Sequence, residues 1–186
     1  MFYDYCQNNI FDDAVRDEIL SERVKEVKEK ILSWLKEEAM SPEEMADPNA
    51  YFNVKVKVGG LVFHVVQNVR NIDSLFVGGN LVLTPAQLSL LRNNMDEKRR
   101  QKFFWDLRLA LLGNNELGEF QIKPNPPHDV REVFIASRRI FYDSLTKDRL
   151  ISAILAVYKA TIMVIWMLER YAGAITPKEG KTSLYV

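Results

Sequence analysis

The sequence is poor in the residues that build metal and nucleophile sites. It contains one cysteine, Cys6, and two histidines, His64 and His128. A single cysteine excludes an internal disulfide framework and fits a reducing cytoplasm. No CxxC pair, HExxH motif or GxSxG segment occurs, and no base lies near Cys6 in the sequence. We therefore predict no metal site and no cofactor, and we assign no catalytic residue.

The chain also lacks an excess of charge. Lys+Arg and Asp+Glu both number 25, so the formal net charge is +0. Such a chain has no global field to hold nucleic acid or an anionic membrane. Its composition, 47% hydrophobic and 27% charged, is typical of a soluble globular domain. The first residues are acidic and aromatic rather than basic and then apolar, so we predict no signal peptide and a cytoplasmic location.

One long apolar segment is present, Leu150–Leu168. It is just long enough to span a bilayer. However, Lys159 lies near its centre, and a central lysine costs about 2.5–3.5 kcal/mol on insertion scales. Charged residues flank the segment at both ends without a positive-inside bias. We therefore interpret it as a helix that is buried in a core or packed against a partner chain, with Lys159 on an exposed stripe and no membrane contact.

The first part of the chain predicts a surface helix over Asp13–Ala39. Its apolar residues recur at steps of three and four, which forms one stripe: Val24, Val27, Ile31, Trp34 and Leu35. A loop follows over Met40–Ala50. Within this loop Ser41-Pro42-Glu43-Glu44 has the form of a capping box, which allows a short helical turn.

After this loop the apolar residues recur at every second position. Over Tyr51–Val58 apolar and polar residues alternate, which predicts a half-buried strand. Gly59-Gly60 predicts a hairpin turn, and Leu61–Gln67 the return strand. A third strand is predicted over Ser74–Leu83, in which Gly78-Gly79 indicates a bulge or a further turn.

Two helices are predicted in the middle of the chain. Thr84-Pro85-Ala86-Gln87 combines a threonine cap, a proline at the first helical position and a glutamine at the third. The helix that it starts extends to about Arg92. A second helix is expected over Met95–Leu112, with Gly113 at its end.

The remaining elements predict the fold class. They are a short strand over Glu119–Ile122, a proline-rich loop over Lys123–Asp129, a strand over Glu132–Tyr142, and a last helix capped by Ser144 or Thr146 and closed by Gly173. The order α-β-β-β-α-α-β-β-α predicts an α+β two-layer sandwich with a mostly antiparallel five-stranded sheet. We expect one domain over residues 13–173, between an extension, 1–12, and a tail, 174–186.

The leading functional hypothesis is an interaction surface. The last helix is apolar on more sides than one small sheet can cover, and its large residues are of the kind found at interfaces. These candidate interface residues are Tyr158, Ile162, Met163, Trp166 and Met167. We predict a homodimer formed through this helix, or a module that binds a protein or peptide partner.

Two other functions stay open. An enzyme or small-ligand binder would need a polar cleft that joins scattered residues such as His64, Asp73, Arg138 and Asp143. Nucleic-acid binding would use a basic patch, which we assign only weakly: Lys98, Arg99, Arg100, Lys102, Arg138 and Arg139. Aromatic residues directly follow the first four, as in proteins that stack bases. Phe103, Leu107 and Leu111 recur at helical spacing, however, which favours a core role and argues against a nucleic-acid partner.

Three segments resemble a known family: Ile31–Glu38 (ILSWLKEE), Asp47-Pro48-Asn49-Ala50 and Phe141–Leu150 (FYDSLTKDRL). They are similar to an uncharacterised, largely archaeal protein family with a type III secretion chaperone-like fold. The resemblance covers roughly residues 24–171 and includes no catalytic motif. It implies a compact α+β domain that dimerises or holds peptide segments. The first twelve residues and the tail from Ala174 depart from it.

Overall fold

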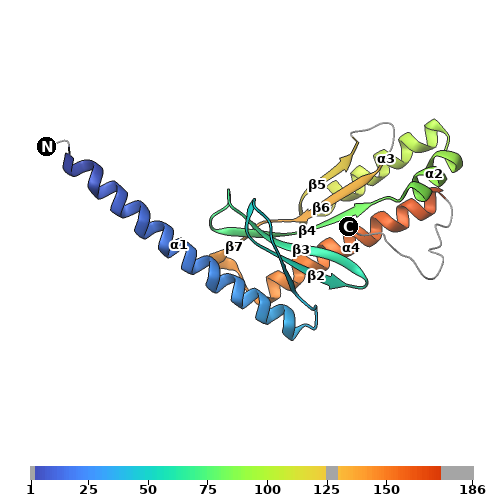
Figure 1. The fold of residues 1–186 in the computed structure, drawn as a ribbon. Coiled ribbons are helices and arrows are strands. Elements are labelled where there is room, and N and C mark those ends of the chain that lie inside the picture. Colours follow the sequence, from blue (N-terminus) through green and yellow to red (C-terminus); the bar gives the residue numbers. More distant parts are fainter. Residues whose placement is uncertain (1–2, 125–129, 173–186) are drawn as a thin grey trace.

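The chain forms four α-helices and groups of consecutive strands between them, as Figure 1 shows for the residues that the structure describes. The structure is a computed structural model that describes residues 3–124 and 130–172, and for residues 3–19 only the course of the helix. The elements are α1 (Tyr3–Glu37), β1 (Glu43–Met45), β2 (Ala50–Val58), β3 (Leu61–Asn68), β4 (Ser74–Val82), α2 (Pro85–Asn94), α3 (Glu97–Leu112), β5 (Leu117–Lys123), β6 (Glu132–Ser137), β7 (Ile140–Phe141), a short 3-10 helix (Tyr142–Ser144) and α4 (Lys147–Ala172).

The strands form one antiparallel sheet in the order β1-β2-β3-β4-β6-β5, and β7 pairs with the start of β4. The α+β class with an antiparallel sheet is therefore confirmed. The predicted number of five strands is wrong, because the described residues contain seven. Alternation places the odd residues of β3, such as Phe63 and Val65, on the buried face, and leaves His64 on the other face.

The first additional strand is β1, where we had allowed a short helical turn. Residues Ala39 and Ser41 have φ of 55° and 47°, which turns the chain back toward β2. Glu43 then lies opposite Lys55, and their side chains form an ion pair of 2.6 Å. The pairing partner thus decides the conformation of a segment whose own residues fit a helix start.

The second additional strand arises because the predicted strand over Glu132–Tyr142 is split. The hydroxyl of Ser137 accepts a hydrogen bond from the backbone N–H of Val77 and donates one to the carbonyl of Arg138. The Ser137 side chain thus takes the place of the backbone hydrogen bond that would continue the pairing of β4 with β6. After Arg138 and Arg139 the chain resumes pairing with β4 as β7.

Gly78 and Gly79 lie within an unbroken β4, so the bulge or turn expected there is wrong. Both residues keep regular register, opposite Ala136 and Ile135 of β6. A Cβ on Gly79 would lie 2.8 Å from the Phe63 ring and 3.4 Å from Val157 of α4. Glycine therefore fits here because the Phe63 ring of the neighbouring strand β3 occupies the space of a side chain.

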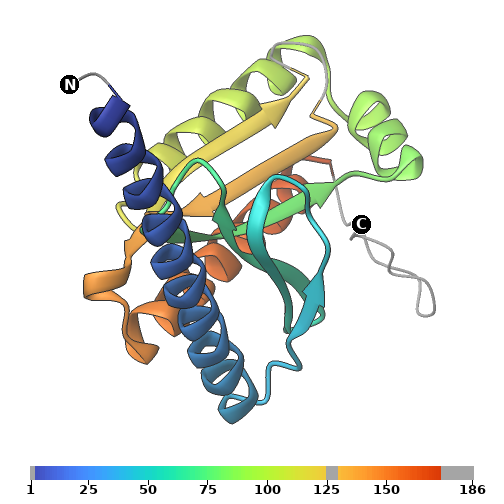
Figure 2. The same ribbon diagram turned by 60° about the vertical axis from the view of Figure 1, so that its left-hand side comes forward.

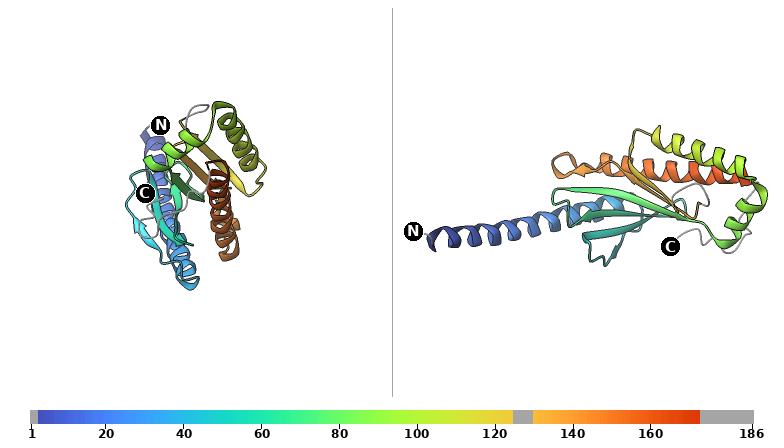
Figure 3. Two further views of the ribbon diagram at one scale, coloured as in Figure 1. Left: turned by 90° about the vertical axis from the view of Figure 1, so that its right-hand side faces the viewer. Right: turned by 90° about the horizontal axis from the view of Figure 1, so that it is seen from above.

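The helices cover one face of the sheet and enclose a single hydrophobic core. The buried sides of α1, α3 and α4 pack against the inward residues of β2, β3, β4 and β6. Figure 2 shows the sheet in front of α3 and α4. Helix α1 begins at Tyr3, earlier than the predicted Asp13, and its first turns extend away from the body (Figures 1 and 3).

The ends of the middle helices follow the sequence rules. Thr84 and Gln87 form the predicted capping box at the start of α2, which continues to Asn94. Helix α3 begins at Glu97, slightly later than predicted, because the carboxylate of Asp96 accepts a hydrogen bond from the backbone N–H of Arg99. Gly113 ends α3 as expected. Thr146 caps α4, and Gly173 lies outside the described residues.

Candidate functional site

Helix α4 has one side that is fully committed to the core. Leu150, Ile154, Val157 and Val164 have no measurable exposure and pack toward the sheet. The ring of Tyr158 meets the ring of Phe63 edge to face, with centroids 6.2 Å apart. This side holds the helix in place and leaves the opposite side free to face outward.

The opposite side of α4 remains apolar. Trp166 is 67% exposed, Leu155 is also exposed, and Ile162 and Met163 are half-buried. Lys159 is exposed among them, as the sequence predicted for the outward side of this helix. Among the described residues, α4 is also long and apolar enough to cross a membrane by length and composition, a property that core helices share. An outward tryptophan with apolar neighbours is typical of a surface that binds another protein.

The five candidate interface residues do not occupy equivalent positions. Trp166 is exposed, and Tyr158, Ile162, Met163 and Met167 are all half-buried. All four of these half-buried residues pack against the core, and Tyr158 does so on Phe63 and over Gly59. Trp166 is therefore the natural centre of an α4 surface, and Tyr158 lies at its edge.

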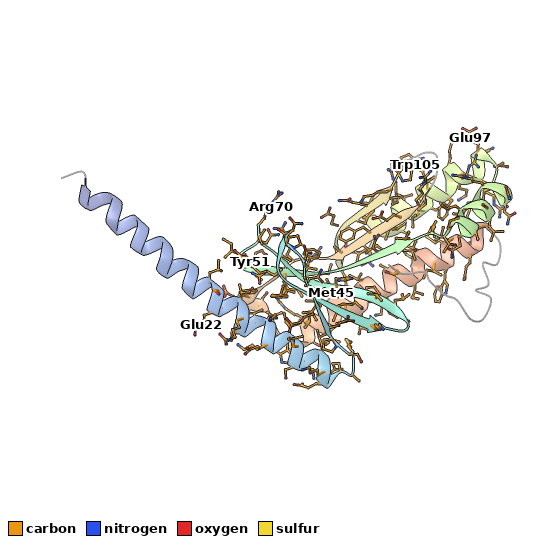
Figure 4. All side chains as sticks on the ribbon, in the orientation of Figure 1. Glu22, Met45, Tyr51, Arg70, Glu97 and Trp105 are labelled. Atoms are coloured by element: carbon orange, nitrogen blue, oxygen red, sulfur yellow. The ribbon has the colours of Figure 1, made fainter. Side chains whose placement is uncertain are left out.

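Helix α3 carries a second apolar stripe, which the sequence analysis missed. Trp105, Leu109 and Leu112 are 60%, 62% and 68% exposed. They lie opposite the buried side of α3, which contains Phe103 and Leu107. The signal was available in the sequence, since the three residues recur at steps of four and three. Figure 4 labels Trp105 on this helix.

Helices α3 and α4 are fastened to each other at one end. The rings of Phe103 and Tyr171 lie 5.3 Å apart, and the Tyr171 hydroxyl donates a hydrogen bond to the Asp106 carboxylate. Lys102 forms an ion pair of 2.8 Å with the same carboxylate. The hydrogen bonds from Lys102 and then from Tyr171 lower the pKa of Asp106. The carboxylate therefore stays ionised and keeps the two helices together.

His64, the centre of the alternative polar cleft, lies on the outer face of β3. Its Nδ1 lies 2.8 Å from the amide oxygen of Asn53, and the amide nitrogen of Asn53 donates to Asp47 at 3.4 Å. Burial, followed by the charge of Lys55, lowers the pKa of His64. The ring is thus neutral near pH 7 and serves a local hydrogen-bond chain.

The other members of that proposed cleft lie elsewhere. Asp143 forms an ion pair with Arg23 of α1, and Arg138 is exposed in the link between β6 and β7. Asp73 accepts a hydrogen bond through its backbone carbonyl from the N–H of Tyr142. Within residues 20–124 and 130–172, no hydrogen bond or ion pair joins any two of His64, Asp73, Arg138 and Asp143. The structure therefore does not bring these four together as a catalytic group.

A polar network connects α1 to the sheet beside Asp143. The Arg23 guanidinium lies 5.3 Å from the centre of the Tyr142 ring. The Tyr142 hydroxyl donates to the side-chain oxygen of Gln67, which has no exposed surface. The Gln67 amide nitrogen donates to the carbonyl of Ile72 at 2.9 Å. Burial raises the pKa of Tyr142 to about 12, so its hydroxyl remains a donor.

Two of the surface hollows are lined by residues that the structure describes. One, of about 390 Å³, lies between Asn71, Phe76, Phe134 and Arg139, and Arg139 donates to the Asn71 amide oxygen at 2.9 Å. The other, of about 470 Å³, lies between the middle of α1 and Tyr51. Neither contains His64 or Arg138 in its wall. In the part of the chain that the structure describes, no group of three or more metal-ligating side chains is close enough to hold a metal ion.

The basic residues form two separate groups. Lys98, Arg99, Arg100 and Lys102 lie in the first turns of α3. Arg138 and Arg139 lie beside Glu116, which follows the other end of that helix. A helix of 16 residues is about 24 Å long, so the groups do not form one patch. Phe103 and Phe104 are buried in the core and are not available to stack on bases.

The fold and the apolar helix layer define an α+β domain with an antiparallel sheet covered on one face. Residues 27–168 match the family model described as "Uncharacterized conserved protein (DUF2299)", and the chain belongs to this family. The predicted resemblance to an uncharacterised family is thereby confirmed.

One solved structure shows the same fold over most of the chain. The chain is similar to an uncharacterized protein from Methanothermobacter thermautotrophicus, with 28% sequence identity and a TM-score of 0.71 over 78% of this chain and 99% of that chain. It is more distantly similar to the Yersinia pestis type III secretion chaperone SycH, solved in complex with a stable fragment of YscM2. There the identity is 10%, the TM-score 0.44 and the coverage 78% and 98%. No curated protein matches the chain.

Proposed function

We propose that this protein is a non-enzymatic, cytoplasmic protein-binding module that self-associates through the outer side of α4. The observation that carries the proposal is the exposure of Trp166 on a 26-residue apolar helix. Burying a tryptophan removes about 150–250 Å² of surface from water, and each Å² contributes roughly 25 cal/mol. Leu155, Ile162 and Met163 extend the apolar surface around it.

The polar side chains support a binding module rather than an enzyme. His64 and Asp143 are each held by a local partner, Asn53 and Arg23, and not by one another. A general base must lie within hydrogen-bond reach of the group that it serves, and an enzyme site would hold such groups together. The single cysteine, Cys6, supports the cytoplasmic location.

The test is the molar mass of the protein by light scattering after size separation without detergent. We expect a species of twice the chain mass of 21.6 kDa. Replacing Ile162 and Trp166 together by glutamate should yield the monomer, because four charges would face each other across a two-fold interface. Ile72→Glu is the matched control, since Ile72 is exposed in the loop between β3 and β4.

Three results would contradict this proposal. A wild-type monomer at all accessible concentrations would exclude self-association. A double variant that stays dimeric would place the interface away from α4. Aggregation that only detergent reverses would instead favour membrane insertion of α4, which has the length and composition for it.

A further inference from the structure

We infer that α3 completes the self-association surface of α4 and that a second copy of the same surface is its occupant. The inference rests on the proposed function and extends it to a second helix. We call this the two-helix surface, and it consists of Trp105, Leu109 and Leu112 of α3 with Leu155, Ile162 and Trp166 of α4.

The two helices lie in one layer on the same side of the sheet. Figure 3 shows α3 beside α4, with the start of α3 near the end of α4. The contact of Phe103 with Tyr171 fixes this pairing at one end. Because α3 turns Phe103 and Leu107 toward the core, Trp105 and Leu109 face away from the sheet. In α4 the buried Ile154 and Val164 likewise leave Trp166 facing outward.

The stripes are close enough to form one surface. Packed helices lie about 8–10 Å apart, which is the reach of a tryptophan or leucine pair. From Trp105 to Leu112 the stripe extends over about 10 Å of helix at 1.5 Å per residue. The helices run in opposite directions from the Phe103–Tyr171 contact. Both stripes therefore face away from the sheet on neighbouring helices of one layer.

The area of this surface fits a dimer. Two tryptophans at 60% and 67% exposure, together with the leucines, present on the order of 500 Å² of apolar surface. A typical stable interface buries about 800 Å² on each partner, including its polar rim. The exposed apolar area therefore supplies the centre of an interface of standard size, and surrounding charged residues supply the rim.

The charge of the chain favours a second copy over a charged partner. The formal net charge is +0, so two copies do not repel each other. The charged residues beside the two stripes carry both signs, with Lys102 and Asp106 paired at 2.8 Å and Asp106 also bonded to Tyr171 of α4. An apolar surface without an excess of positive or negative charge can pack against the same surface of a second copy. In a dimer with two-fold symmetry, each contact between the copies then occurs twice. The guanidinium of Arg108 lies 6.0 Å from the Trp105 ring centre and helps to orient that ring.

The decisive experiment compares one substitution on each helix. We would measure the dimer dissociation constant by sedimentation equilibrium for wild type, Leu109→Glu, Trp166→Glu and the control Ile72→Glu. If both helices contribute, Leu109→Glu and Trp166→Glu should each raise the constant by about 30-fold or more, as at interface hot spots. Ile72→Glu should leave it unchanged.

The outcomes separate the two proposals. If Trp166→Glu dissociates the dimer and Leu109→Glu does not, the inference about α3 is wrong while the function proposed for α4 stands. If neither does, both are wrong. Both sites are exposed, so circular dichroism should show native folding for each variant.

A second measurement does not depend on disrupting the dimer. In the variant Trp34→Phe, the remaining tryptophans are Trp105 and Trp166, one on each helix of the two-helix surface. Their fluorescence emission should shift to shorter wavelength as the protein concentration passes through the dissociation constant, because dimerisation removes the indoles from water. Emission that stays at the wavelength of a solvated indole throughout would place both tryptophans outside the interface.

Discussion

Two helices cover the same face of the sheet, yet their water-facing sides differ in kind. On α1, the outward residues form ion pairs, such as Lys30 with Glu26 at 2.6 Å and Lys28 with Glu44 of β1 at 2.8 Å. On α4, the outward side presents Leu155 and Trp166. Both helices bury an apolar stripe with equal completeness, as the lack of exposure at Ile31 and Ile154 shows.

The difference shows what an ordinary surface helix of this protein looks like. Where water is the neighbour, as on α1, the chain uses lysine and glutamate to separate the core from solvent. The outer sides of α3 and α4 also carry charged residues, such as Lys102 and Lys159, but they add the exposed Trp105 and Trp166. The self-association that we propose would place a second protein surface over these tryptophans in place of water.

The largest effect should come from the two sides of α4 itself. Ile154→Ala removes a fully buried side chain and should lower the free energy of unfolding by about 2–5 kcal/mol. Trp166→Ala should change it by less than about 0.5 kcal/mol under monomeric conditions, because its side chain faces outward. Urea unfolding at low protein concentration measures both. A comparable loss in the two variants would mean that Trp166 belongs to the core.

On the α1 side of the molecule, Tyr142→Phe should have the next largest effect. The substitution removes a hydrogen-bond donor from the buried oxygen of Gln67, which should cost about 1–3 kcal/mol of unfolding free energy. Tyr51→Phe is the control, since Tyr51 is exposed (Figure 4). Equal stability of Tyr142→Phe and wild type would contradict a structural role for this network.

The pH dependence of stability should report on His64. Its pKa in the folded state lies below the ordinary value of 6.5, so the unfolded chain binds the proton more tightly. The stabilisation is complete above pH 6.5 and is lost as the pH falls through the folded-state pKa. Wild type should therefore be less stable at pH 5.5 than at pH 7.5, and His64→Gln should reduce that difference. An identical pH response in the variant would assign it to other groups.

The smallest effect should come from the surface ion pairs of α1. Lys147 of α4 contacts Glu37 and Glu38 at 2.9 and 2.7 Å, and all three side chains are partly exposed. Lys147→Met should cause only a slight loss of stability, which should shrink further in 1 M salt because screening weakens exposed pairs. A dimer held by the apolar two-helix surface should, in contrast, persist in that salt. Dissociation of the dimer by salt would point to a polar interface.

The elements that were predicted correctly are those whose structure is determined by their own residues. Thr84 and Gln87 cap α2 with their own side chains, so the helix start was readable. Gly59 and Gly60 have φ of 58° and 83°, which the hairpin requires and glycine tolerates. Phe52, with the other inward residues of β2, shows the alternation of a half-buried strand directly. No distant partner is needed to read these features.

The errors occur where a distant segment decides the structure. Glu43–Met45 becomes a strand because β2 pairs with it, and the hydroxyl of Ser137 ends β6 because Val77 lies opposite. Gly79 suggested a bulge, but its neighbours Phe63 and Val157 come from two other elements. For the candidate surface, Trp166 was identified from its helix alone. The stripe that contains Trp105 was missed because α3 is apolar on two sides, and only packing against the sheet decides that the side of Phe103 is the buried one.

Strand β4 has a consequence for how the chain folds. It pairs with β3 across a short turn, but its other edge pairs with β6, and Val82 lies opposite Glu132. The segment between these two residues contains α2, α3 and β5, so closing this loop costs more chain entropy than closing the turn before β4. We therefore expect the β2-β3-β4 meander to form first. The hairpin of β5 and β6 then joins it along the free edge of β4 in the slow, non-local step of folding.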